Sequence, residues 1–134
     1  MPIKGRTVIV GMGAMGSALA GGWIAQRLLK ASDIWGVDTD RAKLLSAKRK
    51  WGIKVGKASQ ALPGAQLVLL AVKPQQMRCF LETEGSLIPS RALVISIAAG
   101  LSTAQLEKQL PQGCPLVRVM PNTPAQLGAG MSAV

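Results

Sequence analysis

Hydrophobic residues along this chain gather in six short, nearly continuous runs that alternate with stretches of helical character. The runs lack the period-two alternation of a half-exposed strand, which indicates strands buried on both faces. Such strands belong to a parallel sheet that is covered by helices on each side. The expected strands are Thr7–Val10, Ile34–Val37, Ile53–Val55, Leu67–Val72, Leu93–Ile97 and Leu116–Met120.

The segments between these runs predict helices. Ser102 and Gln105 form a plausible capping box at the start of the last helix. Strands and helices in alternation predict an α/β fold of the Rossmann type, with a doubly wound, mostly parallel sheet and helices on both faces. A chain of 134 residues is long enough for one such domain. The expected helices are Met15–Leu29, Arg41–Trp51, Ser59–Leu62, Gln75–Glu84 and Thr103–Leu110.

The junction between the first expected strand and the first helix carries the pattern G-x-G-x-x-G. Gly11 can take the tight turn, Gly13 lets the backbone approach a pyrophosphate, and Gly16 lets the helix sit close to the sheet. The phosphates would face the free N–H groups and the positive end of that helix. The alternative is an ordinary structural turn, but the strand before the motif and the helical spacing after it favour dinucleotide binding.

Asp38 follows the second expected strand, 22 positions after Gly16, where a ribose-binding acid is expected. A carboxylate there would hydrogen-bond an unmodified ribose and favour NAD(H) over NADP(H). Arg41 has the opposite effect, because its guanidinium could clamp a 2′-phosphate. The alternative is that Asp38 or Asp40 only caps the following helix.

The ends of the last three strands carry further candidate residues, since the carboxyl ends of parallel strands form the edge at which open α/β sheets bind ligands. Small residues there would let a flat nicotinamide ring approach the backbone, and Asn122 and Thr123 offer an amide and a hydroxyl. The alternative is a set of purely structural loops. The segments are Ala71–Pro74, Ser96–Gly100 and Arg118–Ala125.

The formal charge of +10 comes from 16 Lys and Arg against 6 acidic residues. Lys43, Lys48, Arg49 and Lys50 cluster where a solvated helix face is expected, and aromatic residues for base stacking are nearly absent. We therefore expect no nucleic-acid partner, and attraction of a polyanionic cofactor is a sufficient use for part of the charge.

Other classes of site are disfavoured by composition. Cys79 and Cys114 lack metal-ligand spacing, and the chain has no histidine, so no metal site is expected. No apolar stretch reaches the length of a membrane span, and the N-terminus lacks the pattern of a signal peptide. The expectation is a cytoplasmic protein with no membrane partner.

Taken in order, four motifs resemble the pyrroline-5-carboxylate reductase family, which reduces 1-pyrroline-5-carboxylate to L-proline with NADPH or NADH. The likeness covers nearly the whole chain. Related β-hydroxyacid and prephenate dehydrogenases share the first motif, whereas Met-Pro-Asn-Thr-Pro-Ala is typical of the proline enzyme. The motifs occupy 11–16, 71–74, 94–100 and 117–125, with Gly130-Met131 following.

The resemblance implies a role for each motif, and it assigns no catalytic side chain. A protonated imine is already electrophilic, so placing its carbon near the hydride donor and excluding water supply most of the help. The implied pyrophosphate site is Gly11, Met12, Gly13, Ala14, Met15 and Gly16. Ala71, Val72, Lys73 and Pro74 would border the adenosine side, Ala98, Ala99 and Gly100 the nicotinamide, and Asn122, Thr123 and Pro124 the nicotinamide and the imine.

Members of the resembled family continue into a helical second domain that dimerises, whereas this chain ends at Val134. Residues 1–134 are therefore expected to form the NAD(P)-binding Rossmann domain without that C-terminal domain, to bind cofactor, and to reduce the imine poorly alone. Full-length members are homo-oligomers acting on a small-molecule substrate. Two alternatives remain: a non-catalytic dinucleotide-binding module, and the cofactor domain of a β-hydroxyacid dehydrogenase-like oxidoreductase.

Overall fold

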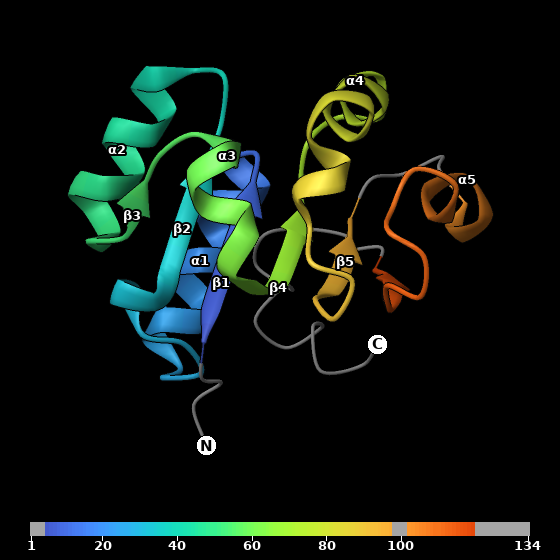
Figure 1. The fold of residues 1–134 in the computed structure, drawn as a ribbon. Helices are drawn as coiled ribbons and strands as arrows, with labels where there is room; N and C mark the ends of the chain where they lie inside the picture. Colours follow the sequence, from blue (N-terminus) through green and yellow to red (C-terminus); the bar gives the residue numbers. More distant parts are fainter. Residues whose placement is uncertain (1–4, 98–101, 120–134) are drawn as a thin grey trace.

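The computed structural model describes residues 5–97 and 102–119, and the strands in this part of the chain form one sheet (Figure 1). The sheet has six strands in the order β3-β2-β1-β4-β5-β6, and every pairing is parallel. The strands are β1 (Arg6–Val10), β2 (Ile34–Val37), β3 (Lys54–Val55), β4 (Ala65–Leu70), β5 (Leu93–Ser96) and β6 (Leu116–Arg118). This is the strand order of the Rossmann-type fold, so the predicted fold class is confirmed.

Helices lie on both faces of the sheet, with α3 in front of it and α1 behind it in Figure 1. Their bounds are α1 (Ala14–Ala25), α2 (Arg41–Trp51), α3 (Ala58–Ala61), α4 (Pro74–Glu84) and α5 (Thr103–Glu107). Three short 3-10 turns at Ala31–Asp33, Leu62–Gly64 and Gly85–Leu87 lead into strands or extended chain.

Alternate residues of the central strand β1 enter two separate cores. Val8 and Val10 pack with residues of α3, α4 and α5. Ile9 packs with Leu19 of α1 and Leu44 of α2. All three β1 side chains are almost fully buried. Burial on both faces is the physical reason for the continuous apolar run in the sequence.

A second contact joins α1 to α2 on the same face. The indole Nε1–H of Trp51 donates a hydrogen bond of 3.1 Å to the hydroxyl of Ser17. A Cβ placed on Gly21 would overlap the Trp51 ring, so this glycine gives the indole its room. The last residue of α2 is thereby held against α1.

The predicted ends of several elements differ from the observed ones. α1 ends at Ala25 and not at Leu29, because Arg27 takes a left-handed conformation with φ of 59° and Leu28 N–H bonds back to the Trp23 carbonyl. α5 ends at Glu107 and not at Leu110, because the hydrogen bonds after it reach back only three residues, from Gln109 N–H to the Leu106 carbonyl and from Leu110 N–H to the Glu107 carbonyl.

Strand β4 also ends earlier than expected, at Leu70 and not at Val72. Ala71 N–H donates the last hydrogen bond, of 2.8 Å, to the carbonyl of Val10, the final residue of β1. Beyond Val10 the neighbouring chain turns away at Gly11, so no partner strand remains for Val72. The predicted end of β6 at Met120 lies outside the described residues.

Candidate functional site

The glycine-rich turn lies where the strand order reverses, between β1 and β4. Gly11 leaves β1 with φ of +99°, a conformation that favours glycine. Its N–H donates 2.7 Å to the carbonyl of Val37 at the end of β2. A Cβ on Gly11 would lie 2.9 Å from the carbonyl carbon and oxygen of Ala71. The turn is thus fixed between the ends of three strands, at the switch point where open α/β sheets bind ligands.

The third glycine of the motif meets the first across the start of α1. A Cβ on Gly16 would overlap the carbonyl oxygen of Gly11 and lie 3.2 Å from Cγ2 of Ile9. Any larger residue would push α1 away from the turn. Gly11 and Gly16 are therefore required by the fold itself.

The second glycine differs from these two, because the space in front of it is open. Gly13 is the N-cap residue of α1 and has an extended conformation with φ of −75°. The single heavy atom near its Cβ position, among the residues described, is the ammonium nitrogen of Lys43 at 4.0 Å. This open approach to backbone is the space that a dinucleotide's pyrophosphate needs.

Among the described residues, no side chain forms a capping hydrogen bond at the start of α1, and the first turn of this helix contains no acidic residue. The first N–H groups of a helix lack partners within the helix, and together with the helix dipole they attract anions. The turn therefore fits a bound diphosphate in shape and in charge.

Asp38, which follows β2, points toward this turn. Its Oδ2 accepts a hydrogen bond of 2.8 Å from Met12 N–H, and its Oδ1 accepts one of 2.9 Å from Asp40 N–H. Met12 itself is buried in the core beneath, so only its backbone faces Asp38. The carboxylate is thus held beside the turn, where the ribose of a dinucleotide is expected.

The helix-capping alternative holds for the other aspartate. Oδ1 of Asp40 accepts hydrogen bonds from the N–H groups of Ala42 at 2.9 Å and Lys43 at 3.4 Å, which makes Asp40 the cap of α2. Asp38 makes no bond to a residue of α2 among the hydrogen bonds of the described part. Arg41, the first residue of α2, is exposed.

The Ala71–Pro74 segment lies against the glycine turn, as expected for residues at the same sheet edge. Ala71 and Val72 are the nearest neighbours of the Cβ position on Gly11, with Cγ1 of Val72 at 3.0 Å. Lys73 is the N-cap residue of α4 and Pro74 is its first residue. The structure thus brings Ala71 and Val72 together with Gly11, and Lys73 and Pro74 follow them at the start of α4.

Six of the predicted site residues lie outside the described residues: Ala98, Ala99, Gly100, Asn122, Thr123 and Pro124. The described chain stops beside the site at Ile97, whose N–H donates 3.2 Å to the carbonyl of Leu70.

Lys43 is a residue that the sequence analysis placed on a solvated helix face. The structure places its ammonium beside Gly13. A signal was available, since a lysine in the first turn of a helix is opposed by the helix dipole and so suggests an anion nearby.

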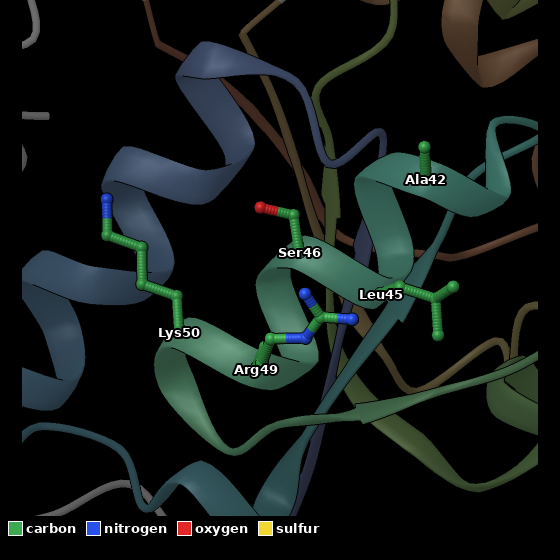
Figure 2. Close-up of a pocket in the computed structure, with 5 residues that line it drawn as sticks. All are labelled: Ala42, Leu45, Ser46, Arg49 and Lys50. Carbon is green, nitrogen blue, oxygen red and sulfur yellow. The ribbon is translucent and has the colours of Figure 1, made fainter.

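Two other features lie away from the turn. Cys114 precedes β6 at the opposite sheet edge, its Sγ 3.2 Å from the Ala92 carbonyl, and burial raises the pKa of its thiol. A hollow of about 550 Å³ lies along α2, and Figure 2 shows the side chains that line it. One helix supplies all of its lining residues, so it is an open groove and not part of the site: Ala42, Leu45, Ser46, Arg49 and Lys50.

Within the described ranges, no helix has the length and apolar character needed to cross a membrane.

Comparison with known proteins agrees with this geometry. The sequence model of the family described as NADP oxidoreductase, coenzyme F420-dependent, matches residues 6–100. Pyrroline-5-carboxylate reductase of Escherichia coli K12 is 35% identical over 126 residues, which are 93% of this chain and 47% of that protein. The Pasteurella multocida enzyme is 38% identical, over 93% of this chain and 46% of its own length.

Solved structures support the same relationship. A pyrroline-5-carboxylate reductase from Coxiella burnetii superposes with a TM-score of 0.80 at 29% identity, covering 93% of this chain and 47% of that one. The Plasmodium falciparum enzyme with NADP bound has a TM-score of 0.76 at 24% identity, over 91% and 44% of the two chains. The resemblance seen in the sequence motifs is confirmed, and the chain spans about half the length of the curated relatives it matches.

Proposed function

This chain belongs to the family described as NADP oxidoreductase, coenzyme F420-dependent, and from that membership we propose that it is the cofactor-binding domain of an NAD(P)H-dependent pyrroline-5-carboxylate reductase. Its small-molecule substrate is 1-pyrroline-5-carboxylate and its product is L-proline. The proposal includes the cytoplasmic location and the homo-oligomeric state expected from the resembled family. Relatives that carry this name match across 93% of the chain, well beyond the end of the family-model match.

The observation that carries the proposal is the difference among the three glycines of the turn. Gly11 and Gly16 are closely packed, whereas Gly13 faces open space at an uncapped helix start. A structural turn would need only Gly11 and Gly16. The open space at Gly13 is explained by a diphosphate that approaches its backbone and accepts hydrogen bonds from the N–H groups of α1.

Each part of the sheet edge has a role in the proposed reaction. The glycine turn holds the pyrophosphate, Asp38 lies beside the ribose, and Ala71–Pro74 borders the adenosine side. The implied nicotinamide and imine contacts are Ala98, Ala99, Gly100, Asn122, Thr123 and Pro124. When bound, the reduced nicotinamide supplies the hydride for the C=N bond. The chain's own contribution is to bind, orient and shield the reactants from water, which requires no histidine.

Calorimetric titration of the chain with NADH and with NADPH tests cofactor binding. We expect Gly13→Val to lose most of the affinity, because its side chain would enter the space of the pyrophosphate. Gly22→Ala is the matched control, since Gly22 lies further along α1 with no atom within 4 Å of its Cβ position. Equal binding by wild type and Gly13→Val would refute the site.

Proline formation from 1-pyrroline-5-carboxylate and NAD(P)H tests the reaction. We expect slow, cofactor-dependent product formation that Gly13→Val abolishes. Tight cofactor binding with no proline formed would favour the non-catalytic module. Oxidation of a β-hydroxyacid with NAD(P)⁺ as the hydride acceptor, and no proline formed from the imine, would favour the β-hydroxyacid dehydrogenase alternative.

A further inference from the structure

Lys43 reaches from the second strand–helix unit to the turn of the first. It is the third residue of α2 and exposed, yet its ammonium nitrogen lies 4.0 Å from the Cβ position of Gly13. Gly13 is the glycine whose backbone a pyrophosphate approaches in this fold. The lysine therefore places a positive charge at the mouth of the diphosphate site.

The position of Lys43 brings its cation close to the positive ends of two helices. The ammonium lies near the N-terminus of α1 and also belongs to the first turn of α2, and each helix start carries partial positive charge. Asp40 offsets the α2 end through its bonds to Ala42 and Lys43. The α1 end has no such carboxylate in its cap or first turn.

Asp38 is the carboxylate held beside the turn. Its two oxygens accept hydrogen bonds from the backbone N–H groups of Met12 and Asp40. The Lys43 ammonium and the uncapped start of α1 thus lie together beside Gly13. Both attract a doubly charged diphosphate at this position.

We propose that Lys43 is a cofactor-binding residue whose ammonium pairs with the diphosphate held by the glycine turn. The inference rests on the proposed cofactor site and adds a side-chain contact to one otherwise made by backbone. It assigns Lys43 to the part shared by NADH and NADPH, and not to the 2′-phosphate that only NADPH carries. Lys43 acts on binding and orientation, since it lies at the diphosphate and not at the reacting carbon.

Titration of Lys43→Ala with NADH and with NADPH tests the proposal. We expect both dissociation constants to rise by about tenfold, the usual effect of losing one charge-assisted hydrogen bond. Both should also become less sensitive to added salt. Lys43→Arg should restore most of the affinity. Lys48→Ala is the matched control, because Lys48 is an exposed lysine in the last turn of the same helix.

The outcomes separate this proposal from the one it rests on. If wild type binds neither cofactor, the dinucleotide site itself is wrong. If wild type binds and Lys43→Ala binds equally well, only the role of Lys43 is refuted. A loss confined to NADPH would also refute it, because the lysine would then serve the 2′-phosphate. Thermal unfolding of the free Lys43→Ala variant should show no loss of stability, since removing the cation relieves its repulsion from the helix ends.

Discussion

The N-termini of α1 and α2 lie at the same edge of the sheet, yet only one of them is closed by its own chain. Asp40 caps α2 with two hydrogen bonds to backbone N–H groups. Gly13 begins α1 with no side-chain cap and no acid in the first turn. The Asp40 carboxylate occupies the backbone N–H groups at the start of α2, whereas those at the start of α1 can donate hydrogen bonds to an anion. The difference separates a structural helix start from a binding one.

The starts of two further helices, α5 and α4, differ from that of α1. α5 resembles α2, because Ser102 and Gln105 form the predicted capping box at its start. α4 lacks a side-chain cap, but Pro74 at its first position has no N–H to satisfy. Among these starts, α1 combines the absence of a cap with glycine and open space.

Gly16→Ala is the change with the largest expected effect, and it would break the geometry on which the α1 start depends. The added methyl would overlap the carbonyl oxygen of Gly11. We expect a loss of about 3 kcal/mol in the free energy of unfolding, measured by urea denaturation, with cofactor binding lost as well. An unfolding midpoint equal to that of wild type would show that α1 can move away from the turn at no cost.

Gly13→Asp would give α1 the cap that α2 already has. The new carboxylate would accept from the first-turn N–H groups and repel the diphosphate. We expect cofactor affinity to fall by about a hundredfold or more, while the free energy of unfolding changes by only a few tenths of a kcal/mol. Calorimetry and urea denaturation measure the two effects. Retained NADH binding would contradict the assignment of this helix start to the cofactor.

Asp38→Ser would change the residue that bonds both to Met12, just before α1, and to Asp40, the cap of α2. Its carboxylate is held beside the turn, where it favours an unmodified ribose and repels a 2′-phosphate. We expect the ratio of the two dissociation constants to shift toward NADP(H) by about 1 to 3 kcal/mol. An unchanged ratio would mean that Asp38 serves only to hold the backbone of Met12.

Asp40→Ala has the smallest expected effect, and it tests whether the capped start of α2 serves stability and not cofactor binding. The loss of the α2 cap should cost about 1 kcal/mol in the free energy of unfolding. The variant removes the same charge as Asp38→Ser from two residues away, so it serves as its control. The preference between NADH and NADPH should stay as in wild type. A shift equal to that of Asp38→Ser would show that net charge, and not position, sets the preference.

The sequence predicts α2 better than α1 for a physical reason. Both ends of α2 carry residues that act through their own chemistry: Asp40 accepts from the first N–H groups, and Gly52 takes a left-handed conformation just after the helix. α1 ends at Ala25, and Arg27, two residues later, adopts the same kind of conformation without being glycine. No residue type marks that ending, so the helical spacing of apolar residues predicted an end at Leu29, four residues beyond the observed one.

In the site, too, features set by local geometry could be predicted from the sequence, whereas contacts between distant segments could not. The turn could be located from Gly11, Gly13 and Gly16 because their spacing reflects local geometry. The roles of Asp38 and Asp40 could not be separated, since both precede α2 and differ only in which backbone they reach. Lys43 approaches Gly13 from 30 positions away. Contacts of that range depend on packing between units, which a local pattern does not encode.

The alternation of β1 side chains between two cores has a consequence for how this protein can change over time. Ile9 lies on the face of α1 and α2, directly beneath Gly16, whereas Val8 and Val10 face α3, α4 and α5. The sheet backbone separates the two sets of side chains. Apart from Val72, which packs on the α3–α5 side and also lies beside Gly11, residues on that side can therefore be exchanged in descendants of this sequence with little effect on the turn. Substitutions on the other side need compensation among close neighbours. Sequence divergence should accumulate unequally on the two faces of the same sheet.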